Sequence, residues 1–232
     1  MYTCNLDCIV EAIHPLIRSE NSYCWGELLY RGAMIRRVDQ WMPWYRGMAD
    51  RIGVIQRQHP YDRISINIDS AQMMDPEIEA SLYALAGLPV AIEWTENLAV
   101  GIGAREIMVV GQKLEALRRE QGFPIVLDDV GTGQDTLGRL CALQLQPDAV
   151  KIDGTIFQLA RSSSRIRQLL SLKVQIYEQQ MKTPVVIEWI ETPDDLLLAQ
   201  DMGATWGQGY LWAYEGFLPG WVQGGTDARK VV

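Results

Sequence analysis

Two adjacent carboxylates, Asp128 and Asp129, follow a short apolar run and precede two glycines. The stretch 125–133 reads Ile-Val-Leu-Asp-Asp-Val-Gly-Thr-Gly. Such a run is typical of a buried parallel strand that ends in a tight loop. Neighbouring carboxylates repel each other, so a pair that leaves the core needs a cation, strong donors or bulk water. A divalent metal is the leading candidate. An ordinary solvated turn is the alternative, because Asp and Gly are common in turns.

Polar residues recur at the ends of most of the other strand-like runs. With the pair above, the set is Glu27, Asn67, Glu93, Glu96, Asp128, Asp129, Lys151, Asp153, Glu188, Glu191 and Gln208. One acid at one strand end is a helix N-cap about as often as it is a ligand. The same chemistry at so many strand ends is hard to explain by capping alone.

Five carboxylates would share a small volume if these strand ends met. They are Glu27, Glu93, Asp128, Asp129 and Glu188, and Lys151 is the obvious internal cation. One lysine cannot balance this charge, whereas two divalent ions nearly could. All-oxygen ligation, with the Asn67 carbonyl, suits Mg²⁺ or Mn²⁺ and gives no hint of zinc. Two such ions bridged by a carboxylate activate water for in-line displacement at phosphorus, which indicates phosphoester hydrolysis.

The elements that must position these residues alternate between strand and helix. Segments 8–16 and 23–30 are β-rich and flank a polar turn at 19–22, which predicts an antiparallel hairpin. Segment 34–58 is mainly helical in pattern. Further strands are predicted at 63–69, 88–96, 125–129, 149–153, 184–191 and 204–211, with helices between them. Strands joined by such short crossovers pair in parallel.

About eight strands is the number that closes a β/α barrel. We therefore predict an α/β fold of the modified TIM (β/α)8 type, mostly parallel with an opening antiparallel hairpin. The carboxyl ends of the strands then converge on one mouth, where catalytic groups of such barrels lie. A doubly wound open sheet is the alternative, but the first strand lacks the glycine turn that would bind phosphate.

Composition sets the outer limits. The 232 residues are 48% hydrophobic and show no linker or low-complexity tract, which predicts one domain over 1–232, with a core at about 8–219 and a loose tail at 220–232. A net charge of −8 argues against binding duplex nucleic acid. The four cysteines lack zinc or disulfide spacing. With neither a signal peptide nor a membrane span in the pattern, we expect a cytoplasmic protein.

Seven segments resemble, in order, the motifs of the EAL family. They are Glu27-Leu28-Leu29-Tyr30-Arg31, Ile66-Asn67, Ile92-Glu93-Trp94-Thr95-Glu96, Leu127-Asp128-Asp129-Val130-Gly131-Thr132-Gly133, Val150-Lys151-Ile152-Asp153, Ile187-Glu188-Trp189-Ile190-Glu191-Thr192 and Gly207-Gln208-Gly209-Tyr210. EAL domains are cyclic di-GMP phosphodiesterases on a modified β/α barrel. The chain is similar to a stand-alone, slightly shortened member, with a short segment between Arg31 and Asn67.

The resemblance implies a role for each matching position. The ligands of one metal would be Glu27, Asn67, Glu93 and Asp128, and those of the second Asp128, Asp129 and Glu188. Catalytic roles around the attacking water would fall to Lys151, Glu188 and Gln208. The substrate contacts would be Leu29, Arg31 and Asp153. Glu96 and Glu191 would anchor the loop 130–137, which in the family links metal binding to dimerisation.

The implied activity is hydrolysis of cyclic di-GMP to linear pGpG with two Mg²⁺ or Mn²⁺ ions, in a homodimer. A catalytically silent cyclic di-GMP receptor and a protein-binding regulator are the alternatives. The family usually has glycine at Trp189, phenylalanine at Val130, alanine at Leu28, and Tyr-Ser-Ser at 134–136. Alternation along a strand would turn Trp94 and Trp189 away from the mouth.

Overall fold

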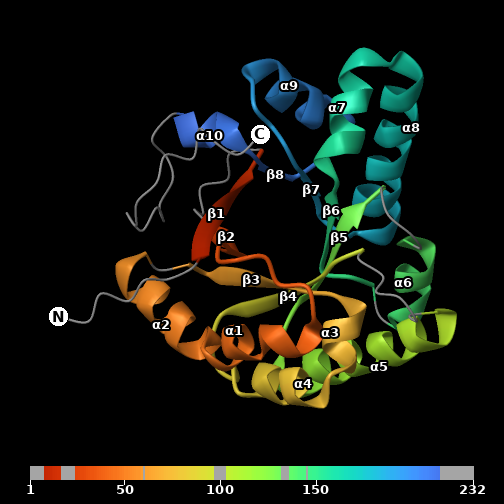
Figure 1. Ribbon diagram of the computed structural model, residues 1–232. Coiled ribbons are helices and arrows are strands. Elements are labelled where there is room, and N and C mark those ends of the chain that lie inside the picture. The colour runs from red at the N-terminus through yellow and green to blue at the C-terminus, as the bar shows by residue number, and fades with distance from the viewer. Residues whose placement is uncertain are drawn as a thin grey trace.

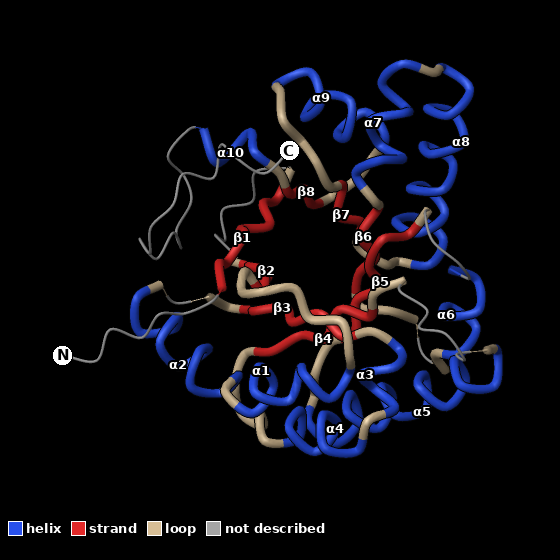
Figure 2. The backbone as a smooth tube through the Cα atoms, viewed as in Figure 1, coloured by secondary structure: helices blue, strands red, loops and turns tan. Residues whose placement is uncertain are grey.

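The computed structural model describes residues 8–16, 24–59, 61–96, 103–131, 136–144 and 146–214. Eight strands close into a barrel in chain order, and helices surround it (Figures 1 and 2). Strand β1 pairs antiparallel with both β2 and β8, and all other neighbours are parallel. The predicted modified β/α barrel with its opening antiparallel pair is confirmed. The predicted turn at 19–22 and the tail at 220–232 lie outside the described residues.

The strands are β1 (Cys8–Pro15), β2 (Trp25–Tyr30), β3 (Arg63–Ile68), β4 (Val90–Trp94), β5 (Ile125–Val130), β6 (Ala149–Ile152), β7 (Val185–Ile187) and β8 (Trp206–Gln208). The helices are η1 (Val38–Trp41), α1 (Met42–Arg46), α2 (Met48–Gln58), α3 (Ser70–Met74), α4 (Pro76–Tyr83), α5 (Ala104–Gln121), α6 (Thr136–Ala142), α7 (Gly154–Ser162), α8 (Ser164–Gln175), the π-helical η2 (Ile176–Met181), α9 (Pro193–Met202) and α10 (Tyr210–Tyr214).

An apolar layer fills the inside of the barrel below the mouth. It consists of Ile13, Trp25, Ala91, Val126, Ala149 and Val186, and is separate from the larger core. Side chains two residues apart on a strand point to the same face. The next inward residues toward the mouth on five of these strands are Glu27, Glu93, Asp128, Lys151 and Glu188. The polar centre therefore lies directly above this apolar layer, which excludes water from the barrel interior beneath it.

Polar side chains cap the first turns of several helices that follow strands. Asp153 accepts hydrogen bonds from the backbone N–H groups of Thr155 and Ile156 at the start of α7. Asp69 caps α3 and Thr192 caps α9 in the same way. Such caps satisfy donors that have no partner within the helix. The capping explanation thus holds for Asp153, one member of the polar set.

The last two strands have only three residues each and are much shorter than predicted. Segment 184–191 forms only β7 (Val185–Ile187), because the backbone turns left-handed at Trp189, where φ is 56°. Segment 204–211 forms β8 (Trp206–Gln208), and α10 begins at Tyr210 after Gly209, whose φ is 150°. The predicted helix at 34–58 is divided into η1, α1 and α2, with Pro43 in the first turn of α1.

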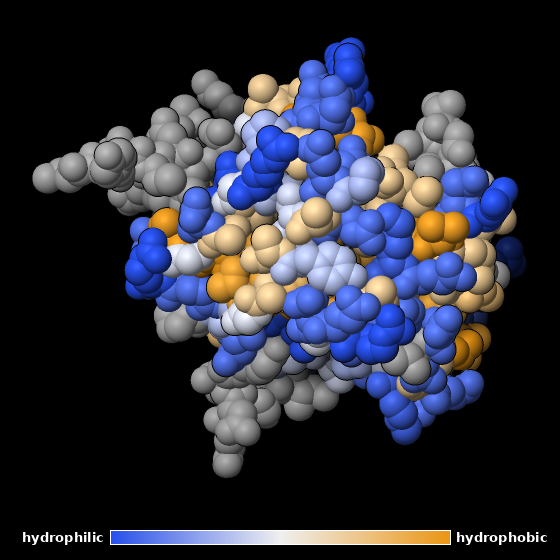
Figure 3. Space-filling view, turned by 90° about the horizontal axis from the view of Figure 1, so that it is seen from below, coloured by the Kyte–Doolittle hydropathy of each residue, from blue (hydrophilic) through white to orange (hydrophobic). Residues whose placement is uncertain are grey.

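The face that carries α4 is mostly polar, with hydrophobic side chains scattered among charged ones (Figure 3). Among the helices of the described ranges, none combines the length and apolar composition needed to cross a membrane.

Candidate metal centre at the barrel mouth

A buried lysine lies at the centre of the mouth. Lys151 on β6 is 1% exposed, and its Nζ lies within ion-pair distance of four carboxylates. The distances are 2.8 Å to Glu27 Oε2, 3.0 Å to Glu93 Oε2, 3.1 Å to Asp128 Oδ1 and 2.8 Å to Glu188 Oε1. An ammonium group has three donors and one charge. Lys151 therefore leaves most of the negative charge of this centre uncompensated.

Two amides complete the inner surface. Asn67 Nδ2 donates to Glu27 Oε1 at 2.5 Å, and Gln208 Nε2 donates to Glu27 Oε2 at 2.8 Å. Each amide uses its N–H group in this way, so its carbonyl oxygen stays available. Among the described residues, Asn67 Oδ1 and Gln208 Oε1 are buried without a hydrogen-bond partner, and so are Glu93 Oε1 and Glu96 Oε2. Buried acceptors that lack donors fit a bound cation with oxygen ligands.

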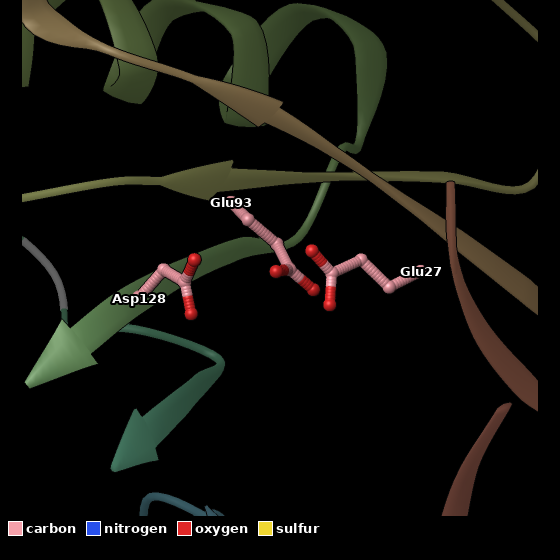
Figure 4. A group of neighbouring side chains, drawn as sticks. All are labelled: Glu27, Glu93 and Asp128. Atoms are coloured by element: carbon pink, nitrogen blue, oxygen red, sulfur yellow. The ribbon is translucent and has the colours of Figure 1, made fainter. Parts of the chain in front are cut away.

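The carboxylates form two groups that could each hold a metal ion. Glu27, Glu93 and Asp128 point toward one another from β2, β4 and β5 (Figure 4). Asp128, Asp129 and Glu188 form the second group, and within each group the ligand oxygens lie within 4.8 Å of one another. Asp128 belongs to both, so the donor set fits two neighbouring cations that share one carboxylate.

A β-bulge brings both aspartates to the mouth. Consecutive residues of a regular strand point to opposite faces. Between the pairs Leu127↔Val150 and Val130↔Ile152, however, β5 has two residues where β6 has only Lys151. Asp129 also adopts a left-handed backbone with φ of 51°. A bulge of this kind redirects a side chain, and here it allows two neighbours in sequence to serve one centre.

The proton affinities reflect the excess of negative charge. Burial, followed by the nearby Asp128 and a hydrogen bond with Glu96, raises the pKa of Asp129 to about 10. Burial also raises the pKa of Glu188 to about 8, and Asp128 and Glu27 add to this although Lys151 opposes it. Burial acts to lower the pKa of Lys151, but its four carboxylates raise it well above the usual range. The lysine is thus charged, and part of the carboxyl set binds protons readily.

Glu11 is a further acid in this centre that the sequence reasoning missed. It lies opposite Glu27 in the register of β1 and β2, and its pKa is raised by burial and then by Glu27. Its side chain also hydrogen-bonds with Gln208. A search at carboxyl ends of strands excludes Glu11 because β1 runs antiparallel. The hairpin register, with Glu11 two residues from the inward Ile13, is the signal that could have found it.

Arg139 on α6 was also missed. It is fully buried, its Nη1 donates to the backbone oxygen of Trp94, and its charge lies near Asp128, Glu96 and Asp129. A lone charged residue in a helix pattern is taken as solvent-exposed by default. The guanidinium group of Arg139 lies next to the carboxylate cluster and offsets part of its negative charge.

The other expected residues lie at the periphery. Leu29 is half-buried near the end of β2, and Arg31 is exposed just after it. Glu191 is exposed and outside both carboxylate groups, while its backbone N–H donates to Asp195. Glu96 reaches Asp129 through their shared hydrogen bond. Residues 132–135 of the expected loop 130–137 lie outside the described residues.

The two tryptophans beside the carboxylates differ. Trp94 is fully buried on the outer face of β4, and its Nε1 donates to Ser70 Oγ of α3 at 3.0 Å. The prediction that it turns away from the mouth agrees with this placement. Strand alternation does not apply to Trp189, because β7 ends at Ile187, so the same prediction for Trp189 stays a prediction. Trp189 is 52% exposed.

The EAL domain family model matches residues 31–214. The chain belongs to the EAL domain family. The match begins four residues after Glu27, so the place of Glu27 in the centre rests on the structure and on the resemblance of its motif.

Several relatives of this EAL domain are named as cyclic di-GMP phosphodiesterases. The chain is 29% identical over 205 residues to the cyclic di-GMP phosphodiesterase PA2567 of Pseudomonas aeruginosa, covering 85% of this chain and 33% of that protein. It is 28% identical over 180 residues to the probable cyclic di-GMP phosphodiesterase PdeB of Escherichia coli, covering 75% and 32%. RocR of P. aeruginosa, a cyclic di-GMP phosphodiesterase, is 25% identical over 178 residues, covering 75% and 43%. The chain thus spans less than half the length of these relatives.

Solved structures share the fold. BlrP1 of Klebsiella pneumoniae, solved with calcium and cyclic di-GMP, has a TM-score of 0.68 at 23% identity, covering 88% of this chain and 54% of that one. The EAL domain of Mycobacterium smegmatis DcpA has a TM-score of 0.64 at 18% identity, covering 91% of both chains.

Proposed function

We propose that this EAL domain hydrolyses cyclic di-GMP to linear pGpG with two divalent cations, Mg²⁺ or Mn²⁺. The observation that carries the proposal is the pair of carboxylate groups that share Asp128 beside the buried Lys151. Relatives named as cyclic di-GMP phosphodiesterases support the same substrate. The ions would be held by Glu27, Asn67, Glu93 and Asp128 on one side and by Asp128, Asp129 and Glu188 on the other.

Divalent cations bound there supply charge that activates water and stabilises an in-line displacement at phosphorus. The chain's own groups orient and move the protons. Once carboxylates are shared with cations, Lys151 Nζ can donate to the attacking water and to the charged phosphate oxygens. Gln208 Oε1, which has no hydrogen-bond partner among the described residues, would accept a hydrogen bond from that water. Glu188 would take up the proton released, for which its carboxylate must first be ionised.

Substrate contacts are assigned to residues at the rim. The exposed guanidinium of Arg31 would bind a phosphate of the dinucleotide, since arginine matches phosphate geometry. Leu29 and Asp153 would contact the rest of the substrate, and Asp153 would do so while it caps α7. Glu96 and Glu191 would hold the loop after Asp129.

The test is direct incubation of the protein with cyclic di-GMP and Mg²⁺ or Mn²⁺, with pGpG followed by chromatography. An Asp129→Ala variant should lose at least about 100-fold of the turnover, because it breaks the second ligand group. Asp39→Ala, which removes an exposed carboxylate paired only with Arg37, is the control and should keep full activity. Tight binding without turnover would indicate a receptor. Neither binding nor turnover would favour a protein-binding regulator.

We also propose that the chain forms one domain over 1–232 and assembles as a homodimer. Light scattering coupled to size exclusion should give twice the 26.2 kDa chain mass. A monomer at high protein concentration would contradict the dimer. The cytoplasmic location expected from the sequence stays a prediction.

A further inference from the structure

Trp189 has a costly backbone conformation and an exposed side chain. Its φ is 56°, and its side chain is half exposed directly after the site residue Glu188. A bulky residue with a left-handed φ is a true outlier, since its Cβ crowds the backbone. Such strain persists only where the surrounding structure holds it, and it concentrates at functional sites.

Two neighbouring elements hold Trp189 in place. Its indole lies against Gly154, the first residue of α7, so closely that a Cβ added at Gly154 would lie 2.1 Å from the indole Cγ. The backbone oxygen of Trp189 accepts a hydrogen bond from Gln158 Nε2 at 3.1 Å. The next residue, Ile190, is fully buried, and its N–H donates to Gln208 O at 3.0 Å. Gly154 has no side chain, and this leaves the space in which the indole packs against the start of α7.

The contact with Gly154 places the indole at the end of the barrel where the strands have their carboxyl ends. Glu188, on one side of Trp189 in the chain, reaches Lys151 at 2.8 Å. Gly154 follows Asp153 at the carboxyl end of β6. Both neighbours of the indole therefore belong to the end of the barrel that carries the metal centre. The indole, which packs against Gly154, therefore lies at this end of the barrel, and its side chain is half exposed there.

A rigid, half-exposed aromatic ring beside a phosphate-directed centre is suited to stack on a nucleobase. We propose that Trp189 is a stacking platform for one purine base of the cyclic dinucleotide and that Gly154 sets its position. This inference rests on the proposed function. A protein surface is disfavoured because the nearby Glu188, Asp153 and Gln158 are polar, whereas protein-binding patches are contiguous and apolar.

The first experiment measures binding and turnover separately. We would determine Kd for cyclic di-GMP by titration calorimetry with Ca²⁺ in place of Mg²⁺, with chromatography to confirm that the nucleotide stays intact, and kcat and KM with Mg²⁺. Trp189→Ala and Trp189→Gly should raise Kd and KM about tenfold, because an aromatic platform is lost. Trp189→Phe should stay within about threefold of wild type, since a ring remains. The kcat of all three should change little.

A double-mutant cycle tests whether Gly154 positions the indole of Trp189. Gly154→Ala should displace the indole and weaken binding about as much as Trp189→Gly does. In the Trp189→Gly background, Gly154→Ala should have no further effect, because the ring that it displaces is absent. Leu169→Ala, which shortens another exposed apolar side chain on the outer side of α8, is the control and should bind like wild type. Circular dichroism melts would confirm that each variant is folded.

The outcomes separate the two levels of the proposal. Wild-type turnover with an unchanged or lower Kd in Trp189→Ala overturns the stacking role and leaves the proposed function standing. Equal losses in Leu169→Ala, or a further loss from Gly154→Ala in the Trp189→Gly background, also overturn it. Absence of both binding and turnover in the wild type overturns the proposed function together with this inference.

Discussion

At the residue scale, the Lys151 ammonium contacts four carboxylates that come from distant parts of the chain. The ion pair of Lys151 with Glu27 joins residues 124 positions apart. Removal of one partner from a buried charge cluster leaves the rest uncompensated, which typically destabilises a protein by about 3–5 kcal/mol. The lysine is therefore expected to stabilise the fold while cations are absent.

We expect Lys151→Met to lower the free energy of unfolding by about 3 kcal/mol in EDTA, and by less when Mg²⁺ supplies the missing charge. Urea melts with EDTA or Mg²⁺ would measure both values. Lys113→Met is the matched control, because Lys113 pairs only with Glu79 and both side chains are 24% exposed. That pair should contribute about 1 kcal/mol or less. Equal losses in the two variants would contradict the central role of Lys151.

The raised carboxyl pKa values predict how metal binding depends on pH. Asp129 and Glu188 have pKa values near 10 and 8 when folded, above their unfolded values. Their contribution to stability is thus fully present below the unfolded pKa and is lost as the pH rises through the folded values. Cations must displace the same protons. The rise in Tm on adding Mg²⁺ should therefore grow between about pH 6 and pH 9. A pH-independent rise would show that neither carboxyl binds the cation.

Most of the site could be predicted at this scale, since parallel strands must bring their carboxyl ends together. Residues such as Glu93 and Lys151 follow from that rule alone. Glu11 does not, because its strand runs the other way. The exposure of Trp189 does not either, because it depends on where β7 stops and on the glycine at 154, and neither is visible in a periodic pattern.

At the element scale, α6 is held close to α5 by a glycine. A Cβ at Gly111 of α5 would lie 2.4 Å from the backbone oxygen of Ala142, the last residue of α6. Helix α6 also carries Arg139 to its place behind the carboxylates. The contact between the two helices thus fixes a cation of the centre. The sequence predicts both helices but not the distance between them. A glycine within a helical pattern can have several causes and does not by itself indicate a close helix contact.

Gly111→Ala should push α6 outward and lower the free energy of unfolding by about 1–3 kcal/mol, as overpacking does. Gly53→Ala on α2 is the control: a Cβ there would meet only Arg57 Nη1 at 3.5 Å. That change should be neutral or stabilise by up to about 1 kcal/mol, since alanine favours helix. Chemical denaturation would measure both. A stabilised Gly111→Ala protein would mean that the two helices can separate freely.

At the scale of the whole molecule, the polar centre at the mouth links strands from both ends of the chain. The hydrogen bond from Gln208 to Glu27 joins β8 to β2 across 181 positions, while β1 lies between these strands. The apolar layer beneath the polar centre contains residues from six strands. The overall barrel is predictable because alternating elements leave few ways to bury both faces of a parallel sheet. The positive φ angles of Trp189 and Gly209, which follow the ends of β7 and β8, are not visible in the hydrophobic pattern.

Because ligands come from both halves of the chain, cation binding should stabilise the barrel as one unit. A site filled to 100 times its Kd adds about 2.7 kcal/mol to stability. Hydrogen exchange followed by mass spectrometry should show that Mg²⁺ slows exchange in β2 together with β5 and the segment after β7. Both carboxylate groups then take part, since Glu27 belongs only to the first and Glu188 only to the second. Protection confined to β5 and β7 would mean that the first group binds no cation, and the charge of Glu27 and Glu93 would remain with Lys151 alone.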